Sequence, residues 1–231
     1  MSFTIGVLGG MGPLATRHFL GQIYRKIPTA CDQDYPNIVL SSRAETPDRS
    51  AYLMGSGPSP VPALVRALSW LAEEADVIAM PCNTAHAFYG LLQSRCPVPL
   101  LHMPNLCAEH LAKSNVNDVL LLGTEGTLYA GIYQGILRDK GIHVSLPPRA
   151  FLPQVADAIA ALKRGGFPPD DFFAYCDTYA ERAGCDRILL GCTEFSLCTE
   201  EFAFPCTDPT EALAREAARL HLRSAETALA T

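Results

Sequence analysis

Two cysteines, Cys82 and Cys192, occupy matching places in the sequence. Each follows a short apolar run, DVIAMP at 76–81 and RILLG at 187–191, and each precedes a segment compatible with a helix. The thiolate of a cysteine at the beginning of a helix is stabilised by the helix dipole and by free backbone N–H groups. The matched contexts therefore predict two reactive sulfurs, although a free cysteine taken alone is more often a small buried apolar residue.

Two thiols on opposite sides of a cleft suit a reaction in which one face of a carbon loses a proton and the other face gains one. One sulfur would act as thiolate and the other as thiol, and the two roles would be exchanged for the reverse direction. Racemisation is the simplest reaction of this kind. The pair therefore indicates a two-base proton transfer.

Three charged side chains could bind a substrate. Arg49, in the loop TPDRS, and Lys163 could each hold a side-chain carboxylate, the arginine by a bidentate fork and the lysine as a point charge. Glu194 could orient a substrate ammonium or help to position Cys192. His86 is equally compatible with a functional role and with a helix residue whose ring is hydrogen-bonded to backbone.

A glycine turn at 9–13 follows the first apolar run and admits three interpretations. Gly10, Gly12 and Ala15 match the GxGxxA form of a dinucleotide-binding turn, but no clear acidic residue ends the second strand at the expected place, so nicotinamide binding is disfavoured. The preferred interpretation is that backbone N–H groups at Gly12 and its neighbours bind a carboxylate at the start of a helix. The glycines could also serve only the turn.

Short apolar runs alternate with helix-compatible segments along the whole chain, which predicts an α/β protein with parallel sheets. The runs are continuously apolar, as expected where helices cover both faces of a sheet. Ligands of such folds bind beyond the carboxyl ends of the strands. The expected strands are FTIGVLG, NIVLSS, DVIAMP, PLLHM, DVLLLG, HVSLP and RILLG.

The sequence contains a weak internal repeat. GVLGGMG at 6–12 resembles LLLGTEG at 120–126, and ADVIAMPCNTA at 75–85 resembles CDRILLGCTEF at 185–195. The repeat predicts two similar Rossmann-like (flavodoxin-like) lobes related by a pseudo-twofold axis, with the active site in the cleft between them.

The expected division of the chain follows from this repeat. The N-terminal lobe comprises 1–101, with 208–231 returning to it, and the C-terminal lobe comprises 102–207. By analogy with the first turn, Thr124 and Thr127 of the second lobe are expected to provide donors for a carboxylate.

Composition excludes several classes of function. The net charge is −6 with no block of basic residues, which disfavours nucleic acids and anionic membranes as partners. The chain begins with a strand-like run rather than a leader, and no apolar stretch is long enough to span a bilayer, so a cytoplasmic protein is expected. The six histidines are scattered and no CxxC occurs, so no metal is expected.

Five motifs together resemble the aspartate/glutamate racemase family, and most closely its aspartate racemase branch. They are LGGMGPLAT at 8–16, TPDRS at 46–50, MPCNTAH at 80–86, LLGTEGT at 121–127 and LLGCTEFSL at 189–197. The resemblance implies an enzyme without organic cofactor or metal that acts on a small acidic amino acid. It also implies a homodimer with the site of each chain between its lobes.

The resemblance assigns roles to individual residues. It implies that Cys82 and Cys192 are the catalytic pair and that Arg49 and Lys163 hold the distal carboxylate. The substrate contacts that it implies are Met11, Asn83, Thr84, Thr124, Thr127 and Thr193, to which the residue analysis above adds Gly12 and Glu194.

Other reactions occur on similar scaffolds. They include racemisation of glutamate and of hydantoins, cis–trans isomerisation of maleate and decarboxylation of arylmalonates. Decarboxylases typically keep one of the two cysteines, whereas this chain has both. The sequence CTE at 192–194, where glutamate racemases typically have CTH, favours aspartate or a broader range of amino acids. A catalytically silent dicarboxylate-binding protein is the alternative outside enzymes.

Overall fold

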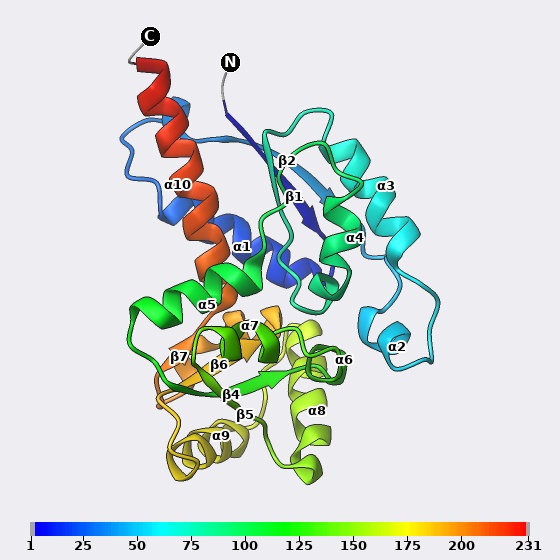
Figure 1. Cartoon of the computed structure of the whole chain (residues 1–231), viewed down its shortest axis with the longest axis vertical. Helices are drawn as coiled ribbons and strands as arrows, with labels where there is room; N and C mark the ends of the chain where they lie inside the picture. The colour runs from blue at the N-terminus through cyan, green and yellow to red at the C-terminus, as the bar shows by residue number, and fades with distance from the viewer. Residues whose placement is uncertain (1–2, 230–231) are drawn as a thin grey trace.

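The computed structural model describes residues 3–229, so residues 1–2 and 230–231 of the expected N-terminal lobe lie outside the described chain. Its strands form two separate sheets, one above the other in Figure 1. The first sheet has the order β2-β1-β3 and the second β5-β4-β6-β7, and every pairing is parallel. The α/β prediction with parallel sheets is therefore confirmed.

The bounds of the strands agree with most of the predicted runs. They are β1 Thr4–Gly9, β2 Asn37–Ser42, β3 Val77–Ala79, β4 Asp118–Gly123, β5 His143–Ser145, β6 Arg187–Gly191 and β7 Cys206–Thr207. The expected strand PLLHM is reduced to a single parallel bridge between Leu100 and Ile78. Pro97 and Pro99 cannot donate backbone hydrogen bonds to a neighbouring strand, and helix α5 begins at Met103, which leaves no room for a longer strand.

The helices lie on both sheets (Figure 1). Their bounds are α1 Pro13–Arg25, α2 Arg49–Leu53, α3 Val61–Leu71, α4 Tyr89–Gln93, α5 Met103–Lys113, α6 Glu125–Tyr129, α7 Gln134–Asp139, α8 Leu152–Lys163, α9 Asp170–Arg182 and α10 Pro209–Leu229. Short 3-10 turns are η1 Asp32–Asp34, η2 Thr84–Phe88, η3 Arg149–Phe151, η4 Thr193–Leu197 and η5 Thr199–Glu201.

Each central strand is buried on both faces, which explains its continuous apolar sequence. In β1, Ile5 and Val7 pack with side chains of α1 and α10, whereas Leu8 packs with α3 on the opposite face. In β4, Leu121 packs against α5 and α7, whereas Leu120 packs against α8 and α9. Successive side chains of a strand point to opposite faces, so both sheets are covered by helices on both sides.

The two lobes approach each other closely where α2 of the first faces α6 of the second. A Cβ atom at Gly126, in α6, would lie 2.6 Å from the Cα atom of Ser50, in α2. No side chain fits in this gap, because backbone lies directly opposite. Gly126 therefore permits the contact between the lobes.

We expect Gly126→Ala to lower the free energy of unfolding by about 1–3 kcal/mol, since the added methyl group must push α2 away from α6. Urea unfolding measures the change. Gly135→Ala is the matched control, because a Cβ at Gly135 would meet nothing within 4 Å. Equal stability of Gly126→Ala and Gly135→Ala would contradict the close contact.

Candidate active site

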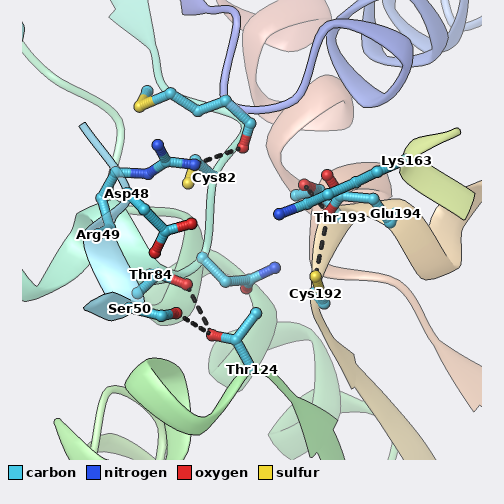
Figure 2. Close-up of a pocket in the computed structure, with 12 residues that line it drawn as sticks. Asp48, Arg49, Ser50, Cys82, Thr84, Thr124, Lys163, Cys192, Thr193 and Glu194 are labelled. Carbon is cyan, nitrogen blue, oxygen red and sulfur yellow. Dashed lines mark hydrogen bonds between the residues drawn. The ribbon is translucent and has the colours of Figure 1, made fainter. Parts of the chain in front are cut away.

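A small pocket lies where the carboxyl ends of the central strands of the two sheets meet. Most of the side chains around it follow β1, β3, β4 and β6, where ligands of parallel α/β sheets bind, whereas Asp48, Arg49 and Ser50 come from the segment after β2 and Lys163 ends α8. Figure 2 shows Cys82 and Cys192 on opposite sides of this pocket. The residues that line it are Met11, Asp48, Arg49, Ser50, Cys82, Asn83, Thr84, Thr124, Lys163, Cys192, Thr193 and Glu194.

Two of the residues expected to bind substrate do not line this pocket. Thr127 is fully buried behind Thr84 and Thr124, and Gly12 lines an adjoining hollow instead. Conversely, Asp48 and Ser50 line the pocket although they were not among the predicted residues. Both flank Arg49 in the motif TPDRS. This motif is the feature of the sequence from which they could have been predicted.

The thiol of Cys192 is buried and donates a hydrogen bond to Glu194, with 3.0 Å between Sγ and Oε2 (Figure 2). Burial raises the pKa of Cys192 well above its ordinary value, the carboxylate of Glu194 raises it further, and the charge of Lys163 opposes the shift. Cys192 therefore holds its proton in the free protein. The expectation that its thiolate is stabilised by a helix dipole is wrong, because only the five-residue 3-10 turn η4 follows and burial outweighs its field.

The loop that carries Cys82 is held by His86. The ring Nδ1 lies 2.8 Å from the carbonyl oxygen of Cys82, and the backbone N–H of Met103 donates to Nε2 at 3.2 Å. Since Nε2 accepts, the proton is on Nδ1 and the ring is neutral. Burial lowers the pKa of His86 to about 4, which agrees with this assignment. His86 does not line the pocket, and it fixes the backbone beside Cys82.

Hydroxyl groups join the two lobes below the pocket. Ser50 Oγ donates to Thr124 Oγ1 at 2.9 Å, and Thr84 Oγ1 lies 3.0 Å from Thr124 Oγ1 and 2.9 Å from Thr127 Oγ1. Thr124 also accepts from the backbone N–H of Thr127 and so caps α6. The threonines expected to bind a carboxylate thus form a network between the lobes.

Arg49 and Lys163 bring positive charge to the pocket from different lobes. The terminal nitrogens of Arg49 donate to the carbonyl oxygens of Thr46, Pro47 and Met11 at 3.0–3.3 Å. Part of the hydrogen-bonding capacity of the guanidinium is therefore used by the protein itself. Its Nε is buried and has no hydrogen-bond partner. Lys163 ends α8 and forms no ion pair within residues 3–229.

The glycines in the turn after β1 allow other parts of the chain to approach the backbone closely. Gly10 has φ +86°, and a Cβ there would lie 2.4 Å from the backbone nitrogen of Arg43. Its N–H donates to Thr16 Oγ1 at 3.0 Å and is therefore not free to bind a carboxylate. At Gly12, a Cβ would lie 2.9 Å from Oε1 of Glu194, so glycine lets the start of α1 reach this carboxylate.

Three pocket-lining side chains carry a buried polar atom with no hydrogen-bond partner. These atoms are Arg49 Nε, Asn83 Nδ2 and Glu194 Oε1. An unpaired buried polar group is costly, so native proteins keep few of them. Two donors and one acceptor complement a ligand that has carboxylate groups and an ammonium group.

Within residues 3–229, no group of three or more His, Cys, Asp or Glu side chains is arranged to hold a metal ion. Across the same residues, no helix has the length and apolar character needed to cross a membrane.

Comparison with known proteins identifies relatives along nearly the whole chain. The family described as Asp/Glu/hydantoin racemase matches residues 8–217. The structure of the Picrophilus torridus aspartate racemase superposes with a TM-score of 0.79 at 31% identity, covering 95% of this chain and 94% of that one. The broad specificity amino-acid racemase RacX of Bacillus subtilis is 28% identical over 94% of this chain and 98% of its own length. The glutamate racemase of Aquifex aeolicus is 28% identical over 74% of this chain and 67% of its own.

The neutral His86 makes stability depend on pH. Below pH 6.5 the histidine of the unfolded chain takes up a proton, whereas the folded protein resists protonation until about pH 4. The unfolded state therefore binds more protons in this window, and the free energy of unfolding falls as the pH falls through it. The contribution reaches at most about 3 kcal/mol.

Urea unfolding at pH 7 and pH 4.5 measures this dependence. We expect His86→Gln, which lacks a titrating ring, to lose less stability between the two pH values than the unmodified protein. An equal loss in both proteins would show that His86 does not titrate as the structure requires.

Proposed function

The chain belongs to the Asp/Glu/hydantoin racemase family, and we propose that it interconverts L- and D-aspartate by proton transfer between Cα and the two thiols. The observation that carries the proposal is the placement of Cys82 and Cys192 after the equivalent strands β3 and β6, on opposite sides of one pocket. The proposed transfer uses only side chains of the chain itself, with no organic cofactor or metal.

The protonation of Cys192 suggests the order of the first turnover. Cys192 holds its proton because burial and Glu194 raise its pKa, so it is the donor. This leaves Cys82 to remove the proton from Cα on one face while the S–H of Cys192 protonates the other face. After the inversion Cys82 carries the proton and Cys192 is the thiolate, which is the arrangement needed for the reverse reaction.

The unpartnered polar atoms support an α-amino acid as the ligand. Asn83 Nδ2 and Arg49 Nε can donate to carboxylates, and Glu194 Oε1 can accept from the ammonium. Negative charge that develops as Cα loses its proton is spread toward the α-carboxylate, where fixed donors stabilise it. Lys163, a second cation without an ion pair among the described residues, favours an additional carboxylate on the substrate side chain.

A second hollow beside the pocket supports a broader range of substrates. It is larger than the main pocket and shares Met11, Asp48, Arg49, Lys163 and Glu194 with it. Side chains longer than that of aspartate could extend into it. Glutamate and neutral amino acids therefore belong in the substrate panel, together with maleate, the substrate expected of a cis–trans isomerase.

We expect Cys82→Ser and Cys192→Ser each to lower the rate of racemisation at least about 100-fold, because each removes one of the two proton-transfer groups. Proton NMR of L-aspartate in D2O, with chiral chromatography of the product, measures exchange at Cα and formation of the D-isomer. Cys31→Ser is the control, because Cys31 is exposed and lies outside the pocket.

Formation of D-aspartate at the unmodified rate by either pocket variant would sink the two-thiol proposal. If the unmodified protein shows neither exchange at Cα nor formation of D-aspartate, aspartate is not its substrate. The other amino acids and maleate are then the substrates to test. A homodimer in the cytoplasm remains a prediction, and light scattering of the purified protein tests its dimeric state.

We expect Glu194→Gln to lower the pKa of Cys192, because the variant loses the negative charge that disfavours the thiolate. The pKa should stay above the ordinary thiol value, since burial is the larger cause of the shift. The pH dependence of iodoacetamide alkylation at Cys192, followed by mass spectrometry, measures it. Glu200→Gln, at an exposed position in η5, is the control, and identical profiles for both variants would refute the coupling.

A further inference from the structure

Tyr133 lies directly before α7 in the second lobe and has no exposed surface. Its ring packs in the apolar cluster that surrounds β4 and β6, among side chains that include Leu111, Leu121 and Leu189. A ring held on all sides by a packed core has little freedom to move. The hydroxyl of Tyr133 is therefore fixed in space by the core of the second lobe.

This hydroxyl donates a hydrogen bond across the lobes to Oδ1 of Asn83, the residue that follows Cys82. Burial raises the pKa of Tyr133 well above its ordinary value, so the phenol keeps the proton that it donates. Asn83 is itself 2% exposed and lines the pocket. The contact thus joins the core of one lobe to the site loop of the other.

The bond determines which end of the Asn83 amide is available to a ligand. An amide group has an acceptor oxygen and a donor nitrogen, and it can present either one by rotating about its last bond. With Oδ1 held by Tyr133, Nδ2 is directed to the other side of the planar group. Nδ2 is buried and has no partner in the free protein.

We propose that Tyr133 is a positioning residue, which fixes the Asn83 amide so that its NH2 group donates to a carboxylate of the substrate. The inference rests on the proposed function and adds a residue that does not line the pocket. A carboxylate is the appropriate partner, because Nδ2 can only donate. An ammonium group can instead donate to the buried, unpaired Oε1 of Glu194.

The kinetic test compares Tyr133→Phe with Tyr129→Phe for L-aspartate. Tyr129 is 71% exposed and lies in the neighbouring helix α6, so the same substitution there is a matched control. In Tyr133→Phe the amide can rotate and present its oxygen, so we expect KM to rise about tenfold. A purely structural role would reduce the active fraction, which lowers kcat and leaves KM unchanged.

A double-mutant cycle separates positioning from other effects of the lost hydroxyl. In an Asn83→Ala background there is no amide to orient, so Tyr133→Phe should change ligand affinity no further. Equal effects of Tyr133→Phe in the presence and in the absence of Asn83 would overturn the inference.

Binding of succinate, measured by calorimetry, tests the inference independently of racemisation, because succinate has two carboxylates and no amino group. We expect Tyr133→Phe to bind it about tenfold more weakly than the unmodified protein and Tyr129→Phe to bind it equally well. With that result, absence of aspartate racemisation would refute the proposed function and leave the inference standing. Equal succinate affinity of Tyr133→Phe and the unmodified protein, or no binding to the unmodified protein, would overturn the inference.

Discussion

The contact between the two lobes is the constraint on which the site depends, because it determines how far apart the two thiols lie. Each lobe carries one of the two pocket cysteines, so neither lobe alone can place two pocket sulfurs on opposite sides of a ligand. The lobes meet through polar contacts at the pocket, in which Ser50 and Thr84 bond to Thr124 and Asn83 bonds to Tyr133. Buried hydrogen bonds are directional, so they fix an orientation more sharply than apolar packing does. Gly126 allows this contact because a side chain at that position would hold α2 and α6 apart.

Polar groups at the site are only partly satisfied by the protein, and this links stability to ligand binding. Arg49, Asn83 and Glu194 each make hydrogen bonds to the protein and each keep one buried atom unpaired. Unpaired buried groups destabilise the folded state. A complementary ligand that forms hydrogen bonds with them stabilises it. The same arrangement keeps the proton on Cys192, since burial and the nearby carboxylate both oppose the thiolate. Binding and protonation are thus set by the same few side chains.

The size and charge of the site bear on which substrates it accepts. The main pocket is small and carries two cations from different lobes, which suits a short amino acid with a second carboxylate. The adjoining hollow shares five lining residues with it and is larger. The chain resembles both an aspartate racemase and a broad specificity amino-acid racemase. A small pocket beside a larger hollow is compatible with either behaviour, and tests with different substrates distinguish them.

The sequence alone determined the class of the fold and the positions of the two cysteines, because both depend on local pattern. Continuous apolar runs mark buried parallel strands, and residues that follow such strands gather at one edge of a sheet, so Met11, Cys82, Thr124 and Cys192 could be placed near each other. The tertiary structure decided which side chains contact one another. It placed Thr127 behind the pocket, added Asp48 and Ser50 to its wall, and brought Tyr133 to Asn83. It also decided that Cys192 is protonated. Burial and contacts between residues distant in the chain arise only when the lobes pack together, so no local pattern encodes them.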